Sequence, residues 1–198
     1  MRDAAAALRA GEPVILPTDT VYGLCAAAHE AAPTERLYRL KGRDSAQPSA
    51  LFAADLGVLL ECVPELRGRA EQIARALLPG AYTLILPNPA RRYPWLTGSN
   101  PDAIGVRVAV LPDVAEQVLA QIGCLVATSA NLPGEPEPRR VEDVPSELRA
   151  AVGAIVDAGE LPGRSSTVID FTGAEARVLR EGAGSVANAL ERAASALA

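Results

Sequence analysis

The stretch Pro79-Gly80-Ala81-Tyr82-Thr83-Leu84-Ile85-Leu86 decides the fold class of this 198-residue chain. Upstream of it, a proline at a first helical position and apolar residues one turn apart predict a helix over 64–78. The next two residues end that helix, because proline cannot continue a helix and glycine is common just beyond helix ends. The aromatic and aliphatic residues of 82–86 then predict a strand. A helix and a strand therefore follow each other directly here.

The rest of the chain changes irregularly between strand and helix patterns. We expect strands at 14–16, 20–28, 50–53, 104–110, 125–128, 154–157, 167–170 and 177–179. We expect helices at 3–10, 34–40 (capped by Thr34), 114–122 and 185–197. No repeat or linker divides the chain, so the sequence predicts one α/β domain over residues 1–198, with a twisted, mixed β-sheet flanked by helices. The proline-rich segment 87–101 is too long for a simple turn and predicts a rim or lid.

Composition and charge exclude several classes of protein. Hydrophobic residues make up 49% and charged residues 22%, a globular composition. The net charge of −5 argues against a dedicated nucleic-acid binder, which would carry a basic face. Without a signal peptide or a run long enough to span a membrane, we expect a soluble, cytoplasmic protein. Cys25, Cys62 and Cys124 form no Cys-x-x-Cys pair, so we expect buried thiols in a reducing compartment and no metal site.

Lys41 is the only lysine of the chain, and the other eighteen basic residues are arginines. Lysine offers a compact, rotatable charge and arginine a planar fork. Lys41 and Arg43, on either side of a glycine, therefore suggest a polyanion held in two geometries, with phosphate as the obvious candidate. In that case we expect both side chains to be solvent-accessible in the empty protein. The alternative is a solvated helix end whose cations offset the helix dipole.

Common catalytic motifs are missing from the sequence. It contains no phosphate-loop motif, no Gly-x-Gly-x-x-Gly after a strand and no Gly-x-Ser-x-Gly elbow. His29 is the only histidine, so a histidine-based catalytic triad is not favoured, and a surface or turn role suits His29 better. An enzyme of this sequence would work by positioning and charge stabilisation, without a covalent nucleophile.

Four polar clusters interrupt the apolar segments, at 17–24, 41–47, 127–131 and 164–167, the last followed by Arg180. Each has an ordinary explanation in turns, caps or strand ends. Together they would bring hydroxyls, amides and cations to the edge of the sheet, where α/β proteins bind small ligands. The sequence thus predicts a ligand cleft at that edge.

Seven motifs occur in the order seen in one known family: Pro17-Thr18-Asp19-Thr20-Val21-Tyr22-Gly23-Leu24, Lys41-Gly42-Arg43, the stretch 79–86, Gly105-Val106-Arg107-Val108, Thr128-Ser129-Ala130-Asn131, Ser166-Thr167-Val168-Ile169-Asp170 and Leu179-Arg180-Glu181-Gly182. Over about residues 11–183 the chain therefore resembles the YrdC-like family, the threonylcarbamoyl-adenylate synthases. A single motif would be weak evidence for the family, whereas all seven motifs in this order make the resemblance specific. The resemblance implies the short, single-domain form of the family.

The resemblance implies a nucleotidyltransferase that converts ATP, L-threonine and bicarbonate into threonylcarbamoyl-AMP and pyrophosphate. The product would pass to a separate tRNA threonylcarbamoyltransferase complex, which modifies adenosine 37 of tRNA. An in-line displacement at the α-phosphorus needs alignment and neutralised charge, which agrees with the lack of a nucleophile motif. Mg²⁺ would accompany ATP, and direct tRNA binding would be weak or absent.

The matching positions imply a role for each site residue. Lys41 and Arg43 would be the catalytic pair on the nucleotide phosphates. ATP would also contact Gln47, Ser129, Asn131 and Arg180. Threonine would be bound by Thr20, by Arg107 through its carboxylate, by Ser166 and by the backbone of Ala127.

The chain departs from the family pattern at three positions near the predicted site residues. Phe52 stands where the family often has histidine, Ala103 where threonine is common, and Asp44 where proline is usual. These departures leave open a paralogue with a different substrate. A non-catalytic RNA- or ribosome-binding protein of the same fold also stays open, although the acidic net charge argues against it. A carbamoyl-adenylate enzyme of hydrogenase maturation is a further alternative, but such chains carry acylphosphatase and zinc-finger segments that this sequence lacks.

Overall fold

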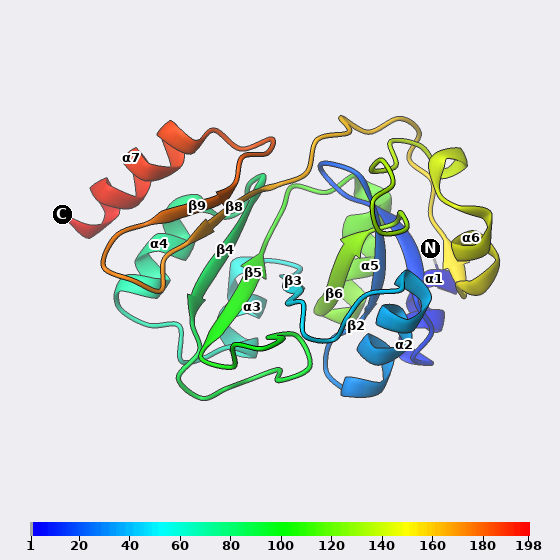
Figure 1. Cartoon of the computed structure of the whole chain (residues 1–198), viewed down its shortest axis with the longest axis horizontal. Helices are drawn as coiled ribbons and strands as arrows, with labels where there is room; N and C mark the ends of the chain where they lie inside the picture. The colour runs from blue at the N-terminus through cyan, green and yellow to red at the C-terminus, as the bar shows by residue number, and fades with distance from the viewer. Residues whose placement is uncertain (1) are drawn as a thin grey trace.

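The computed structural model describes residues 2–198. Its helices are α1 (Arg2–Arg9), α2 (Ala31–Lys41), α3 (Leu56–Cys62), α4 (Arg69–Leu77), α5 (Asp113–Ile122), α6 (Ser146–Ala151) and α7 (Val186–Leu197), with a short 3-10 helix, η1 (Val141–Asp143). Its strands are β1 (Val14–Pro17), β2 (Tyr22–Ala27), β3 (Ala50–Ala53), β4 (Tyr82–Pro87), β5 (Ala103–Arg107), β6 (Cys124–Ser129), β7 (Ala154–Ile155), β8 (Thr167–Asp170) and β9 (Arg177–Arg180). In Figure 1, α4 and α7 lie at the end of the molecule with β9, and α1, α2 and α6 lie at the other end.

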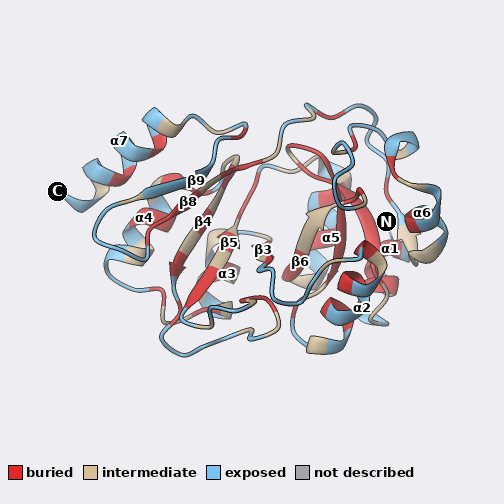
Figure 2. Cartoon of the chain, viewed as in Figure 1, coloured by how far each residue is buried: buried red, intermediate tan, exposed pale blue. Residues whose placement is uncertain are grey.

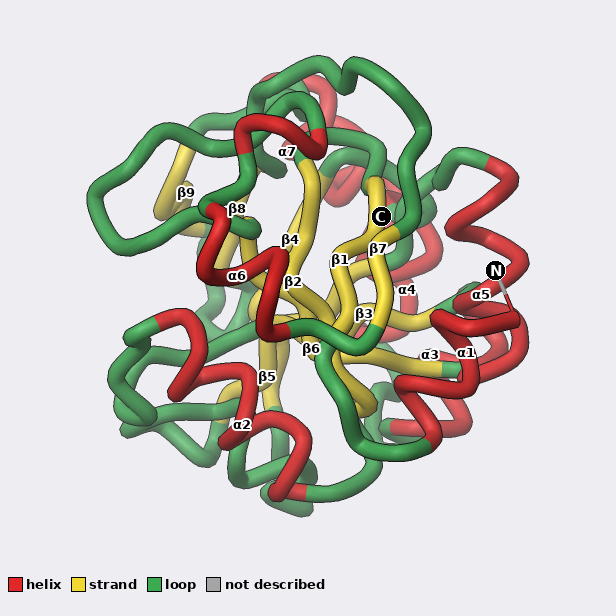
Figure 3. The backbone as a smooth tube through the Cα atoms, turned by 90° about the vertical axis from the view of Figure 1, so that its right-hand side faces the viewer, coloured by secondary structure: helices red, strands yellow, loops and turns green. Residues whose placement is uncertain are grey.

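The strands of the described residues join one nine-stranded sheet in the order β7-β1-β2-β6-β3-β5-β4-β8-β9. Three neighbouring pairs are parallel, β1 with β7, β3 with β5 and β4 with β8, and the other pairs are antiparallel. The predicted mixed sheet is therefore confirmed. Viewed from the side, strands run through the middle of the molecule and helices lie on both sides of them (Figure 3).

Alternating side chains give the sheet two different faces. In β6, Cys124 and Val126 belong to one apolar cluster, and Leu125 between them belongs to another. The first and larger cluster packs the sheet against α2, α3, α4 and α7. The second cluster lies on the opposite face, against α1 and α5. Burial of these apolar groups is concentrated on the strands and on the inward sides of the helices (Figure 2).

The expected helix over 64–78 is wrong in its first half. The chain forms α3, then a turn, and then α4 from Arg69. Asp55 caps α3, because its carboxylate accepts a hydrogen bond from the backbone N–H of Val58 at 2.8 Å. Gly68 precedes α4 with a φ of 56°, a conformation that favours glycine. The proline that suggested a helix start lies in the turn between the two helices.

Other boundaries also differ from the prediction. Thr34 does not cap α2, which begins at Ala31, and the Thr34 hydroxyl is buried without a hydrogen-bond partner. The strand expected over 104–110 ends at Arg107. Helix α6 was not expected at all.

No helix among residues 2–198 is long and apolar enough to cross a membrane.

Candidate active site

A cavity of about 560 Å³ lies against the sheet face that also carries the smaller apolar cluster. Gly23 of β2, Ala50 of β3, Gly105 of β5 and Ala127 of β6 line it. These residues have little or no side chain, so they leave room above the middle of the sheet. The expected location at the edge of the sheet is therefore wrong, because the polar groups converge on one of its faces.

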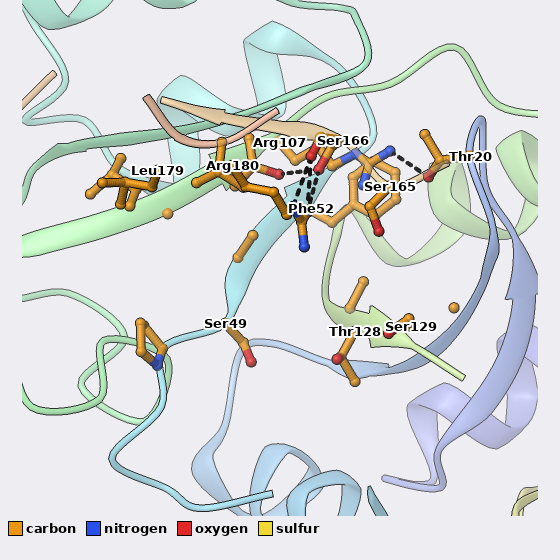
Figure 4. Close-up of a pocket in the computed structure, with 18 of the residues that line it drawn as sticks. Thr20, Ser49, Phe52, Arg107, Thr128, Ser129, Ser165, Ser166, Leu179 and Arg180 are labelled. Carbon is orange, nitrogen blue, oxygen red and sulfur yellow. Dashed lines mark hydrogen bonds between the residues drawn. The ribbon is translucent and has the colours of Figure 1, made fainter. Parts of the chain in front are cut away.

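Figure 4 shows two groups of side chains across this hollow. One group comprises Thr20, Phe52, Arg107, Ser165, Ser166, Leu179 and Arg180. The other comprises Ser49, Thr128 and Ser129. We call the first group the arginine wall and the second the serine wall.

Arg107, the last residue of β5, is a cation of the arginine wall. Its Nη2 donates to the Asp19 carboxylate, and to Thr20 Oγ1 at 3.1 Å. The guanidinium lies over the Phe52 ring, 5.3 Å from the ring centroid. Arg107 Nε is buried and has no hydrogen-bond partner. Within residues 2–198 no hydrogen bond uses its Nε or Nη1, so the guanidinium keeps donors for an anion.

Asp19 balances the Arg107 charge within this wall, and both side chains are only 13% exposed. Burial raises the pKa of the Asp19 carboxyl above its usual value, and the Arg107 charge opposes that shift. Thr18 shapes the turn that carries Asp19, because Thr18 Oγ1 accepts from the backbone N–H groups of Thr20 and Val21, both at 3.2 Å. The ion pair thus fixes the direction of the arginine.

Arg180, the last residue of β9, holds Ser166 in the same wall. Its Nε and Nη2 donate to the Ser166 carbonyl oxygen at 3.1 and 2.9 Å. The Ser166 hydroxyl shares a hydrogen bond with Thr83 Oγ1 at 2.9 Å. Next to it, the Ser165 hydroxyl donates to Glu137. Two of the expected site residues, Ser166 and Arg180, are therefore in direct contact.

Lys41 is buried behind the serine wall, contrary to the expectation that it would be solvent-accessible, and is only 5% exposed. Its Nζ donates to the Ser129 carbonyl oxygen at 2.6 Å, to Asn131 Oδ1 at 2.5 Å and to the Asn131 carbonyl oxygen. These acceptors use all three hydrogens of the ammonium. Burial lowers the pKa of Lys41 to about 8, and the charge of the nearby Arg43 contributes.

Gly42 turns the chain between Lys41 and Arg43, since it ends α2 in the left-handed conformation with a φ of 66°. Arg43 then lines the cavity, donates to the Pro48 carbonyl oxygen at 2.6 Å and lies over the Tyr38 ring. Arg43 Nε is buried without a partner. Of the two neighbouring cations, Arg43 therefore faces the cavity and Lys41 supports its wall.

The cavity brings together most of the expected site residues. Those that line it are Thr20, Arg43, Arg107, Ala127, Ser129, Ser166 and Arg180. Asn131 lies behind them, where its Oδ1 accepts from the Ser129 hydroxyl at 2.7 Å. Gln47 is exposed on the loop after Arg43 and does not line the cavity. Phe52 and Ala103, at two of the unusual positions, do line it.

Three buried side-chain atoms that have no hydrogen-bond partner in the described part of the chain belong to residues of this cavity: Arg43 Nε, Ser49 Oγ and Arg107 Nε. Buried polar groups are normally bonded, so free donors at one site need an explanation. A ligand rich in acceptor oxygens, such as a phosphate or a carboxylate, would supply their partners.

Sequence reasoning missed several residues of the site. No site role was predicted for Asp19, Ser49, Thr83 or Glu137, although all but Asp19 line the cavity. The only sequence feature that could have indicated a site role for Asp19 was its position beside Thr20. Ser49, Thr83 and Glu137 come close to the site only when the chain folds.

The proline-rich segment 87–101 forms part of the rim, where Thr97 and Asn100 line the cavity. Two of the contacts that anchor it are made by side chains. Arg92 forms a two-point ion pair with Glu65 at 2.6 and 2.7 Å, and Trp95 Nε1 donates to the Ala28 carbonyl oxygen at 3.1 Å. The rim prediction is therefore confirmed.

Residues 2–198 contain no group of three or more histidine, cysteine, aspartate or glutamate side chains that could hold a metal ion. Two carboxylates, Glu137 and Asp170, do line the cavity. The site therefore fits a cation that arrives bound to a ligand better than a cation held by the protein alone.

Comparison with known proteins agrees with this geometry. The family model described as "Telomere recombination", named for the Sua5, YciO and YrdC proteins, matches residues 6–182. The chain belongs to this family. A relative named threonylcarbamoyl-AMP synthase, from Stenotrophomonas maltophilia, is 43% identical over 166 residues, which are 81% of this chain and 86% of that protein.

Two solved structures of the Sua5/YciO/YrdC family have the same fold. Pyrococcus abyssi Sua5 complexed with L-threonine aligns with a TM-score of 0.82 at 32% identity, over 91% of this chain and 53% of that longer chain. Escherichia coli YciO aligns with a TM-score of 0.81 at 29% identity, over 94% of this chain and 91% of that chain. The predicted YrdC-like fold is therefore confirmed.

We expect Asp19→Asn to lower the free energy of unfolding by about 3–5 kcal/mol, because it leaves the buried Arg107 without its counter-charge. The exposed pair of Asp102 with Arg91, whose side chains are 66% and 65% exposed, offers a matched control. Asp102→Asn should change stability very little. Urea unfolding of both variants measures the difference, and equal losses would contradict a structural role for the Asp19–Arg107 pair.

Proposed function

We propose that this member of the Sua5/YciO/YrdC family is a threonylcarbamoyl-AMP synthase, which makes threonylcarbamoyl-AMP and pyrophosphate from ATP, L-threonine and bicarbonate. The observation that carries the proposal is that three residues lining one cavity, Arg43, Ser49 and Arg107, each keep a buried polar atom without a partner in the protein. The substrates supply the carboxylate and phosphate oxygens that such donors need. The relatives named for this activity support the assignment.

The arginine wall suits the threonine carboxylate. Arg107 Nε is free, and the Thr20 hydroxyl beside it already accepts from the same guanidinium at 3.1 Å. Asp19 holds the arginine in place while the ligand uses the remaining donors. The Ser166 and Thr83 hydroxyls, 2.9 Å apart, offer further partners to a small polar amino acid.

The serine wall and the two cations beside it suit the nucleotide phosphates. Arg43 and Ser129 both line the cavity, and Arg43 Nε has no partner in the protein. Lys41 acts through the wall, because its ammonium fixes the backbone of Ser129 and Asn131 and adds positive charge behind them. Arg180 supplies a further cation from the opposite wall. In this proposal Gln47 contacts ATP only if its loop moves inward.

The reaction would proceed by in-line displacement. Bicarbonate takes up a proton and loses water to give carbon dioxide, and the threonine amine adds to the carbon dioxide and loses a proton to form a carbamate. A carbamate oxygen then attacks the α-phosphorus, and the bond to the pyrophosphate oxygen breaks. The chain contributes the alignment of the two substrates and the cations that neutralise the developing charge. Mg²⁺ would arrive with ATP and share the triphosphate charge, with Glu137 and Asp170 as the nearby carboxylates.

The product would leave for a separate tRNA threonylcarbamoyltransferase complex, and direct binding of tRNA by this chain would be weak or absent. The net charge of −5 supports that part of the proposal.

Pyrophosphate release from ATP and bicarbonate, measured with each amino acid in turn, tests the proposed function. We expect threonine to exceed valine, which has the same shape without the hydroxyl, by roughly 100-fold or more, because the cavity presents polar groups that valine leaves unpaired. A faster reaction with another amino acid would indicate a paralogue with a different substrate. No release with any amino acid would contradict the synthase assignment.

We expect Arg43→Ala to reduce kcat/KM for ATP about 100-fold, as the loss of charge-assisted hydrogen bonds to phosphate would. Arg39→Ala is the matched control, since Arg39 is an exposed basic residue of the same helix end and does not line the cavity. Thermal unfolding of both variants checks that the fold is intact. Similar kinetic losses in the two variants would overturn the phosphate assignment.

The lowered pKa of Lys41 predicts a pH dependence of nucleotide binding. An anion stabilises the protonated ammonium, so ATP should raise the pKa of Lys41 above its value of about 8 in the free protein. Affinity for ATP is then full below pH 8 and falls by up to about tenfold per pH unit above it. Calorimetric titration between pH 7.5 and 9.5 checks this, and Lys41→Met should remove the dependence. A flat profile in the wild type would contradict it.

A further inference from the structure

A cluster of reactive side chains lies outside the cavity, around Cys62 at the end of α3 and Cys124 at the start of β6. Their Sγ atoms are 3.5 Å apart, although the residues are 62 positions apart in the sequence. Both cysteines are free thiols, and neither lines the cavity. The ring of His29, the only histidine, lies 3.7 Å from Cys124 Sγ through Nε2. The proposed synthase mechanism uses none of these groups.

The two thiols differ in their access to solvent. Cys62 is partly exposed, whereas Cys124 is fully buried beneath it in the larger apolar cluster. The third cysteine, Cys25, is buried in the other cluster, and burial raises its pKa to about 12. A small reagent from solvent therefore meets Cys62 first, with Cys124 directly behind it.

The surroundings favour a thiolate at Cys62. The pKa of Cys62 is lowered to about 6: the hydrogen bond with Cys124 is the largest cause, burial opposes it, and Tyr93 adds to the lowering. The same interaction raises the pKa of Cys124. The titratable and charged groups facing Cys62 are Cys124, Tyr93, His29, Glu61 and Arg92. At neutral pH the pair thus holds one thiolate, on the exposed sulfur, and one thiol.

We propose that Cys62 and Cys124 form a dithiol oxidation site, at which Cys62 reacts with a hydroperoxide and Cys124 closes the disulfide. The Cys62 thiolate attacks one oxygen of hydrogen peroxide, the O–O bond breaks, and Cys62 becomes a sulfenic acid while hydroxide leaves. The Cys124 sulfur then attacks the Cys62 sulfur, and the S–O bond breaks with loss of water. In sum, two thiols and one hydrogen peroxide give one disulfide and two waters.

The geometry allows the second step with a small movement. Closing the sulfurs from 3.5 Å to a bonded separation requires about 1.5 Å. Cys62 is the last residue of its helix and is only partly buried, at the edge of the larger apolar cluster. Because Cys124 is already in contact, it can capture the sulfenic acid before a second oxidant reaches it.

Intact-mass and peptide analysis of the full chain after treatment with one equivalent of hydrogen peroxide tests the site. Wild type and Cys25→Ser should lose two hydrogens and show a Cys62–Cys124 cross-link. Cys62→Ser should lose none. Cys124→Ala should instead gain one oxygen at Cys62, which dimedone traps as the sulfenic acid. Intermolecular dimers, a cross-link through Cys25, or sulfinic acid at Cys62 of the wild type would overturn the proposal.

The rate of Cys62 alkylation by iodoacetamide gives a second readout that does not depend on the disulfide. In the wild type its midpoint should lie near pH 6. In Cys124→Ala and Tyr93→Phe the midpoint should move toward about 8.5, the value of an ordinary thiol. Circular dichroism of each variant checks the fold. A wild-type midpoint near 8.5 would contradict the thiolate on which the first step depends.

Discussion

The small side chains on one face of the central strands are the constraint on which the site depends. Successive side chains of a strand point to opposite faces of the sheet. A residue that lines the cavity therefore has neighbours in the chain that pack into the larger apolar cluster, as Gly105 has in Ile104 and Val106. A Cβ at Gly105 would lie 3.5 Å from the Ala50 Cα, an ordinary contact, and no left-handed backbone requires glycine there. Room for a ligand, rather than backbone strain, therefore explains the small residue at this position.

The protein holds the cations around this space before any substrate arrives. Arg107 is bound by Asp19, Lys41 by the carbonyl oxygens of Ser129 and Asn131 at the end of β6, and the more exposed Arg180 by the Ser166 carbonyl oxygen. The two buried charges, on Lys41 and Arg107, thus each have a partner, which is the condition for tolerating a charge in a protein interior. The arrangement leaves some donors unused, so a ligand can add bonds without first breaking the ones that orient the arginines. Such preorganisation reduces the cost of binding and of stabilising charge during a reaction.

The sequence was sufficient for the fold class and for many elements, because β3 over 50–53 and β8 over 167–170 are continuous strand patterns. It failed where one residue carried the signal, as with Thr34 and the proline before α4. The motif order identified the family, but the contacts made by its residues are tertiary. Arg107 meets Asp19 across 88 positions, and no local pattern reports that pairing or the burial of Lys41. Gln47 was expected to contact ATP, but it is exposed on the loop after α2.

The composition of the cavity wall limits the chemistry that it can perform. Among residues 2–198, no histidine or cysteine lines the cavity, and the reactive thiol pair lies outside it. The Ser129 hydroxyl bonds to an amide oxygen and the Ser166 hydroxyl to that of Thr83, so neither serine has a base that would activate it. Ser165 is the lining serine with a carboxylate partner, Glu137. In the proposed reaction the attacking atom is instead the carbamate oxygen of a substrate. What remains for the protein is to align two bound molecules, a contribution of up to about 7–11 kcal/mol in well-oriented systems, and to neutralise the charge that develops between them.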